Sequence, residues 1–235
     1  MKKHLSVLML FVRSTLYKFL LLVFVMAAVQ TVFFTLAFRR AEGLFRLNTI
    51  FLGTRPGIVF AVCFLLLFAL LCLTGCDFGS KSGYTFSMLR ISPHMVFLWQ
   101  SVGNLGFIFL LWAAQVCITL TFCSIFTIHY PQEQAAMLVF YSNDFLHNLL
   151  PLEETGILVR NIALLIALAV TSACFPVRMR RGERPVAAIV VVLISVVFFV
   201  RDKGSFMANA MMSIITLAIA AYAAHAVFKK EAGDE

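Results

Sequence analysis

The segment from Gly57 to Gly75 reads GIVFAVCFLLLFALLCLTG and contains no charged residue. A helix needs about 20 such residues to cross roughly 30 Å of hydrocarbon, so this segment predicts a membrane span. Comparable apolar runs recur along the chain. They are continuous and not alternating, which favours helices over the strands of a barrel. The sequence therefore predicts an all-α membrane protein.

The composition supports this class. Of the 235 residues, 62% are hydrophobic and 13% are charged, whereas soluble domains carry about 25% charged residues. A soluble enzyme and a disordered chain are excluded on this ground. The six cysteines suggest no disulfide framework, because most lie in apolar runs, where thiols behave as small hydrophobic groups. The net charge of +8 fits membrane topology, and no nucleic acid is expected as a partner.

Six segments qualify as membrane spans, at about residues 19–38, 57–75, 95–128, 162–177, 186–200 and 206–228. The fourth and fifth are short, about 24 Å at 1.5 Å per residue, so they are expected to thin the bilayer or to lie partly inside the bundle. Basic and apolar side chains mix in residues 1–18, which predicts an interfacial amphipathic helix before the first span. No linker or repeat is visible, so residues 1–235 are taken as one transmembrane domain.

The basic residues predict the orientation. Six spans place both termini on one side, and cytoplasmic segments carry the excess of Lys and Arg. We expect the chain to lie in the plasma membrane with both termini in the cytoplasm. Seven basic residues, Arg160 among them, then fall outside the cell. The other twelve fall inside: Lys2, Lys3, Arg13, Lys18, Lys81, Arg90, Arg178, Arg180, Arg181, Arg184, Lys229 and Lys230.

The longest outer loop, residues 129–159, contains no Lys or Arg. Its apolar residues follow helical spacing and share one face: Leu138, Tyr141, Phe145 and Leu149. We expect residues 132–150 to form an amphipathic helix on or in the outer leaflet. A seventh span is the alternative, and the polar residues Asp144 and His147 would make it costly.

The sequence carries no phosphate-binding loop, no HExxH zinc helix and no nucleophile elbow. Asp144 and His147 share a helix face, but no second His or Cys lies nearby, so no metal site and no catalytic residue is predicted. Glu153 and Glu154 followed by Arg160 resemble the paired-glutamate motif of CAAX-type intramembrane proteases. The arginine comes two residues later than in that family, and the family's Phe-x-x-x-His motif is missing.

Polar residues inside the spans are few, and the third span carries three of them. Gln100 and Asn104 share a helix face, Gln115 lies further along, and Gly103 and Gly106 allow close backbone approach. In hydrocarbon such amides either bond helices to one another or line a path. We expect contacts between helices, with a pore wall or subunit interface as the alternative. No charged residue is expected inside a span.

The inner loop between the second and third spans, residues 76–94, is the most informative about function. A flexible Gly/Ser stretch is followed by Tyr84, Met88 and Ile91 at helical spacing, and Pro93 precedes the third span. A short helix with exposed aromatic side chains has nothing in its own loop to pack against. It therefore predicts a docking surface for another protein.

This loop, the six spans and the interfacial start resemble the permease subunits of ABC exporters, in the type 2 class. The matching residues are Gly83-Tyr84-Thr85 and Met88-Leu89-Arg90-Ile91-Ser92. In that family the loop is the coupling helix, which docks on a separate ATPase subunit. The resemblance implies a bacterial source, a second permease subunit, and ATP and Mg held by the ATPase and not by this chain.

The resemblance also implies which residues face the ATPase. The loop from Arg178 to Arg184, with Arg178, Arg180, Arg181 and Arg184, would be a second contact. The coupling helix itself would contribute Tyr84, Thr85, Phe86, Met88, Leu89, Arg90 and Ile91.

The function expected from this resemblance is ATP-driven export of a hydrophobic or amphipathic cargo, such as a lipid, a peptide or a drug-like molecule. Spans without charged residues disfavour a strongly charged solute. The alternative is a membrane scaffold or accessory subunit that uses the same loop only for docking. A third hypothesis, an intramembrane enzyme, would need Asp144, His147, Glu153 or Glu154 to converge in one pocket.

Overall fold

The computed structural model describes residues 2–40, 47–74, 76, 93–129, 143–151, 154–200 and 205–231, and within these ranges all regular structure is helical. The helices are α1 (Lys2–Arg40), α2 (Leu47–Thr54), α3 (Pro56–Thr74), α5 (Pro93–His129), α7 (Asp144–Leu149), α8 (Thr155–Arg180), α9 (Val186–Val200) and α10 (Phe206–Glu231).

Five of these helices, α1, α3, α5, α8 and α10, are long and apolar enough to cross a membrane. The chain is therefore an all-helical, multi-pass membrane protein. The remaining expected segment, the fifth along the chain, is α9, which is apolar but has 15 residues, about 22 Å at 1.5 Å per residue. A full crossing of the hydrocarbon takes about 20 residues.

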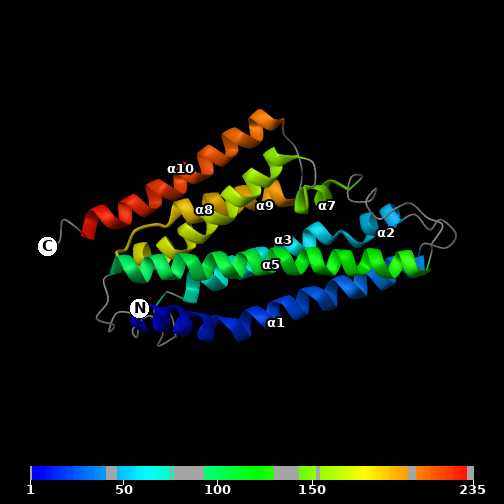
Figure 1. Cartoon of the computed structure of the whole chain (residues 1–235), viewed down its shortest axis with the longest axis horizontal. Helices are drawn as coiled ribbons and strands as arrows, with labels where there is room; N and C mark the ends of the chain where they lie inside the picture. Colours follow the sequence, from blue (N-terminus) through cyan, green and yellow to red (C-terminus); the bar gives the residue numbers. More distant parts are fainter. Residues whose placement is uncertain are drawn as a thin grey trace.

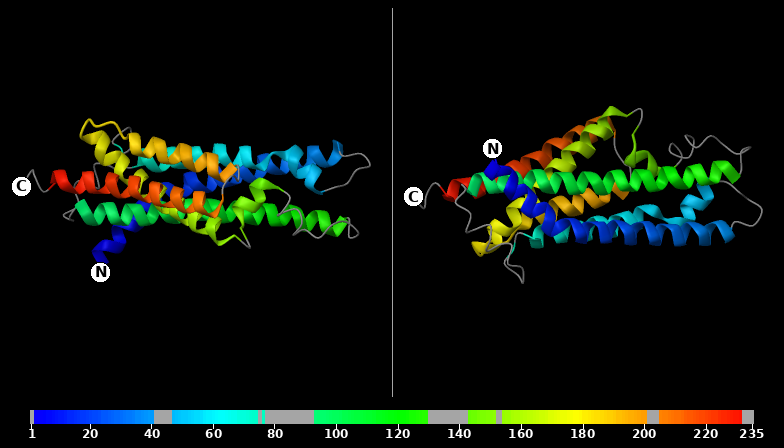
Figure 2. Two further views of the ribbon diagram at one scale, coloured as in Figure 1. Left: turned by 90° about the horizontal axis from the view of Figure 1, so that it is seen from above. Right: turned by 60° about the horizontal axis from the view of Figure 1, so that its bottom comes forward.

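The helices form an elongated bundle (Figure 1). α8 is the most buried of the five long helices, and it packs against α10, α5, α9 and α3. α1 lies against α5 and α3 on the other side of the bundle. The first turns of α1 and the last turns of α10 lie at one end in every view (Figures 1 and 2). The end of α3, the start of α5 and the turn between α8 and α9 lie at this same end.

The bundle is uneven at its opposite end. There α1 and α5 continue past the ends of α8, α9 and α10, and the short helix α2 lies against α1 (Figure 1). At 1.5 Å per residue α1 measures about 58 Å and α5 about 55 Å, both longer than a bilayer's hydrocarbon. The sequence did not predict α2, which packs against α1.

Phenylalanine side chains fill much of the core. Phe34 of α1 stacks on Phe122 of α5, with ring centroids 4.5 Å apart. Phe199 of α9 packs against Phe60 and Phe64 of α3 at 6.1 and 5.5 Å. Tilted and offset rings are the preferred geometry of aromatic pairs. These contacts join helices that are distant in the sequence.

The bounds of two expected elements differ in the structure. Residues 1–18 were predicted as an interfacial helix leading into the first span, and from Lys2 onward they are continuous with that span in one helix. The first turns of this helix bend away from the remainder (Figure 2). The fourth span is also longer than predicted: α8 covers Thr155–Arg180, 26 residues, and not 162–177.

The prediction of a single helix over residues 132–150 was wrong. α7 begins at Asp144, because Asn143 adopts an extended conformation (φ −108°, ψ 113°) and its side chain accepts hydrogen bonds from the backbone of Phe145 and Leu146. An asparagine in this position caps the first turn of a helix and does not continue an earlier one. The expected residues 132–142 lie outside the described ranges.

The two glycines of α5 differ in their surroundings. A Cβ at Gly103 would lie 2.8 Å from the ring of Phe11 in α1, whereas a Cβ at Gly106 would meet nothing within 4 Å. Phe11 is 2% exposed and packs on Phe107, so its ring cannot move aside freely. Gly103 therefore permits the close contact between α1 and α5, and Gly106 does not contribute to it.

We expect Gly103→Ala to lower the free energy of unfolding by about 1–3 kcal/mol relative to Gly106→Ala, the range typical of overpacked cores. Both variants gain the same helix propensity, so their difference isolates the overlap with Phe11. Thermal unfolding of the purified protein in mild detergent measures it. Equal midpoints for the two variants would contradict the close contact.

Candidate functional site

A fully buried arginine is the most unusual feature of the structure. Arg160 lies in the second turn of α8 and is 0% exposed. Arg160 was expected in the outer loop and in no span, but it lies within a helix that is long and apolar enough to cross a membrane. An ionisable residue buried in a membrane protein is expensive and commonly marks a functional position.

Three asparagines surround the guanidinium group. Its Nη1 donates to Oδ1 of Asn209 in α10 at 2.8 Å. Its Nη2 donates to Oδ1 of Asn148 in α7 and to Oδ1 of Asn161 at 3.3 Å. The ring of Phe198 in α9 lies 5.1 Å from the guanidinium carbon, a cation–π distance. The positive charge of Arg160 is thus stabilised by three amide oxygens and by the face of one aromatic ring.

The partners of Arg160 are themselves held in place. Asn148 donates through Nδ2 to the backbone oxygen of Phe198, and Asn161 donates to the backbone oxygen of Asn148 at 2.8 Å. We call Arg160, Asn148, Asn161, Asn209 and Phe198 the arginine node. It ties together four elements, α7, α8, α9 and α10. Its donors point at fixed acceptors, and its geometry is that of a structural clamp carrying a positive charge.

The expected polar residues of the third span also make contacts between helices. Gln115 and Gln30 of α1 exchange amide hydrogen bonds of 2.7 and 3.2 Å. Asn104 donates to Oγ of Ser172 in α8 at 2.8 Å. Gln100 is half-buried, and its Nε2 has no hydrogen-bond partner in the described ranges. The geometry at Asn104 and Gln115 is that of contacts between helices within one chain.

The second inner loop was expected over Arg178 to Arg184. In the structure these residues form the end of α8 and the turn that follows it. Arg178 and Arg180 lie in the last turn of α8, and Arg181 is its C-cap. Nη1 of Arg181 donates to the backbone oxygen of Val227 in α10 at 3.1 Å. Gly182 reverses the chain with a φ of +71°, a conformation that glycine adopts readily. Arg184 is exposed.

The expected coupling residues, Tyr84 to Ile91, lie outside the described ranges. The helices that flank them are described: α3 ends at Thr74 and α5 begins at Pro93. Both of these helix ends lie at the end of the bundle that also carries the turn between α8 and α9 (Figure 1).

The acidic residues of the outer loop form no described catalytic constellation. His147 Nε2 lies 3.8 Å from Oε1 of Glu154, and Asp144 is exposed. In the part of the chain that the structure describes, no three His, Cys, Asp or Glu side chains lie close enough together to hold a metal ion. Glu153 lies outside that part.

Comparison with models of known families, with curated proteins and with solved structures finds no match to this chain.

Arg160→Lys tests the arginine node. A lysine ammonium cannot span both Asn209 and Asn148 as the planar guanidinium does. Hydrogen bonds to charged groups contribute about 1.5–3 kcal/mol, so we expect a thermal midpoint lower by about 3–12 °C, given 2–4 °C per kcal/mol in chains of this size. Arg184→Lys makes the same chemical change at an exposed position and should leave the midpoint within about 1 °C. Equal shifts in both variants would contradict the clamp.

Proposed function

We propose that the chain is the membrane-spanning permease subunit of an ATP-driven ABC exporter. The observation that carries the proposal is that both predicted docking segments adjoin the same end of the bundle. The ends of α3 and α5 that flank residues 75–92 lie at the same end as the turn after Arg180 (Figures 1 and 2). A single ATPase could therefore contact both segments that the family resemblance assigns to docking.

The proposed topology has six crossings, and α9 is the fifth of them along the chain. The short length of α9 requires a locally thinned bilayer, or burial of its far end inside the bundle. The arginine node supports burial, because Phe198 near the end of α9 contacts Arg160 and accepts a bond from Asn148. Twelve inner basic residues against seven outer ones favour cytoplasmic termini in this topology.

The proposed mechanism is mechanical. Closure of two ATPases around ATP would push on the segment before Pro93 and tilt α5, which is one continuous helix of 37 residues. α5 bonds to α1 through Gln115 and to α8 through Asn104. A tilt of α5 would therefore reach helices on both sides of it and alternate the access of a pore formed with a second permease subunit. No covalent step falls to this chain.

One observation favours the second candidate, a scaffold or accessory subunit. Asn104 and Gln115 are 0% exposed and are engaged within the chain. A pore wall would instead present such amides to a path. A scaffold needs only the docking segment and the membrane anchor, and the same experiment separates the two functions.

We expect Tyr84→Asp and Leu89→Asp to reduce the recovery of an ATP-binding subunit with the tagged protein about tenfold or more. A charge placed in the centre of an apolar contact removes a dominant part of the binding energy. Ser80→Asp adds the same charge to the Gly/Ser stretch of the same loop and serves as the matched control. Affinity purification in mild detergent with mass spectrometry measures the recovery, and the amount of chain in the membrane fraction reports insertion.

Stoichiometric recovery of an ATPase that is lost only in the two test variants would support the permease. Recovery of the wild-type chain without an ATPase would reject it and leave the scaffold.

A further inference from the structure

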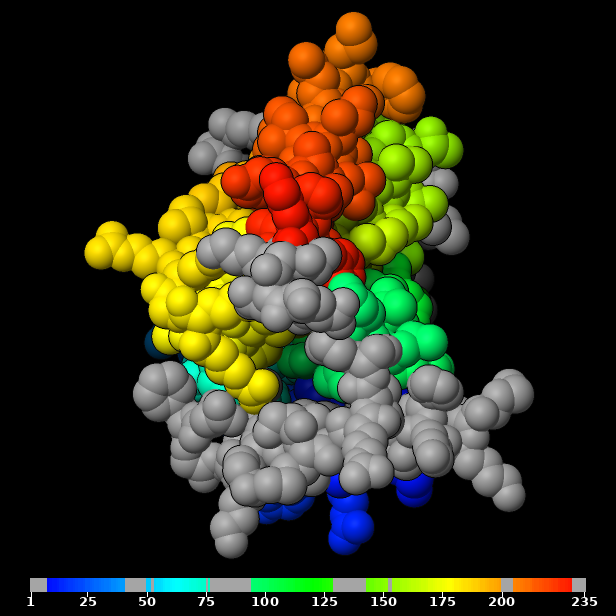
Figure 3. Space-filling view, turned by 90° about the vertical axis from the view of Figure 1, so that its left-hand side faces the viewer, coloured from blue at the N-terminus to red at the C-terminus, as the bar shows by residue number. Residues whose placement is uncertain are grey.

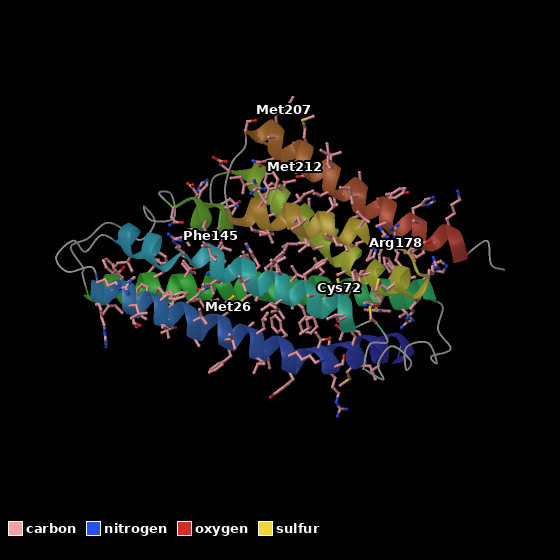
Figure 4. The ribbon with its side chains drawn as sticks, turned by 180° about the vertical axis from the view of Figure 1, so that it is seen from behind. Met26, Cys72, Phe145, Arg178, Met207 and Met212 are labelled. Carbon is pink, nitrogen blue, oxygen red and sulfur yellow. The ribbon has the colours of Figure 1, made fainter. Side chains whose placement is uncertain are left out.

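A proline inside α8 removes the helical donor of one backbone carbonyl. Pro176 has no N–H to bond to the backbone oxygen of Ser172. A carbonyl in a helix points toward the C-terminus, because it accepts from the N–H four residues ahead. The Ser172 oxygen therefore points toward the end of the bundle where α8 ends and α5 begins. Figure 3 looks onto this end, with the end of α8 in yellow and the start of α5 in green, and Figure 4 labels Arg178, two residues after Pro176.

Asn104 of α5 meets α8 at this same serine and brings a second acceptor. Its Nδ2 donates to Oγ of Ser172 at 2.8 Å, and that hydroxyl donates to the backbone oxygen of Ala169 at 3.0 Å. Since the hydroxyl hydrogen is used there, the Asn104 atom that faces Oγ must be the donor nitrogen. Asn104 is 0% exposed, and its Oδ1 accepts no hydrogen bond from a described residue. Oδ1 is thus a shielded acceptor next to Ser172.

Gln100 supplies a shielded donor on the same face of α5. Spacings of 3 and 4 place it between Phe97 and Asn104 on one helical face. Both of these neighbours lie along α8: Asn104 bonds to it, and Phe97 shares a cluster of buried side chains with Cys174. Nε2 of Gln100 is shielded and donates to no residue in the described ranges.

Gln100 also lies level with the proline turn. It is four residues from Asn104, about 6 Å toward the end of the bundle at 1.5 Å per residue. Pro176 is displaced from Ser172 by the same number of residues and in the same direction, because α5 and α8 run in opposite directions (Figure 1). The donor of Gln100 and the acceptors at Asn104 and Ser172 are therefore within one turn of each other.

These three groups match the hydrogen-bonding capacity of one water molecule. Two are acceptors, the Ser172 carbonyl and Oδ1 of Asn104, and one is a donor, Nε2 of Gln100. A water molecule has two hydrogens to donate, and buried waters typically make about three hydrogen bonds to polar groups that otherwise lack partners. In membrane helices, ordered waters are among the groups that satisfy a carbonyl left by a proline.

We propose that one water molecule is bound between α5 and α8 at the Pro176 turn. It donates to Oδ1 of Asn104 and to the Ser172 carbonyl, and it accepts from Nε2 of Gln100. Hydrocarbon offers no bulk water, so this molecule is part of the folded bundle. It lets α8 change its bend at the proline by adjusting bonds to water, with no helical bond broken. The inference needs this chain alone and does not rest on the proposed function.

Magnetisation transfer from water to side-chain amides tests the site directly, by solid-state NMR on the full chain in lipid bilayers. Asn104 and Gln115 form a matched pair, because both are 0% exposed and bonded to a neighbouring helix, and only Asn104 borders the proposed water. We expect transfer to Asn104 to be several-fold faster than transfer to Gln115. Gln100→Leu should slow it toward the Gln115 value. Equal transfer to the two amides in the wild type would overturn the proposal.

A double-mutant cycle tests the bridge independently. Pro176→Ala restores the N–H for the Ser172 carbonyl and so removes one partner of the water. We expect Gln100→Leu to lower the thermal midpoint by about 2–4 °C more in the wild-type background than in the Pro176→Ala background, the contribution of about one hydrogen bond. Equal effects in the two backgrounds would overturn the proposal, because Gln100 would then not be linked to the carbonyl.

Trp112→Phe is the control for this cycle. Nε1 of Trp112 is also a shielded donor of α5 without a hydrogen bond to a described residue, and it lies two turns beyond Asn104. Its removal should have the same effect in both backgrounds, within about 1 °C. A midpoint that rises with sodium chloride and not with choline chloride would also overturn the proposal, because the site would then hold a cation.

Discussion

A polar group inside a bilayer has no water to bond with, and this constraint governs how the helices fit together. The apolar surfaces of helices are largely interchangeable, because hydrophobic contact has no direction. Hydrogen bonds between side chains do have direction and length. Gln30 with Gln115 fixes α1 against α5, and Asn104 with Ser172 fixes α5 against α8. The arginine node then fixes α8 against α7, α9 and α10. Each of these bonded helix pairs is thereby held in one register.

Hydropathy alone located most helices well. Spans expected at 57–75, 95–128 and 206–228 correspond to α3 (Pro56–Thr74), α5 (Pro93–His129) and α10 (Phe206–Glu231). Proline, glycine or charged residues bracket these runs, so their limits are local properties of the sequence. The start of α8 is not local. Arg160 and Asn161 look like loop residues until Asn148 and Asn209, distant in the sequence, supply acceptors.

In the candidate site, too, some features are local properties of the sequence and others depend on residues that are distant along the chain. The residue types that would need partners in a membrane, such as Asn104, Gln115 and Asn209, were visible in the sequence, but their partners were not. A single sequence gives no pairing between Gln30 and Gln115, which lie 85 positions apart. Arg160 was missed for a specific reason: twelve inner basic residues against seven outer ones already gave an inward excess, so the charge count did not require Arg160 to be buried. A cluster of asparagines around one arginine was the available signal.

The arrangement of bonds along α8 determines how this helix can move. Near its first turns Arg160 is bonded to Asn209 of α10, and after its last turn Arg181 is bonded to the backbone of Val227, also in α10. α8 and α10 are therefore tied at both ends. Between these ends Pro176 lacks the N–H that would bond to the carbonyl of Ser172, which weakens the helix at that turn. Asn104 of α5 contacts α8 at this same residue, Ser172. A displacement of α5 would therefore bend α8 at its weakest turn and would not slide it along α10, because sliding would break the bonds at both ends.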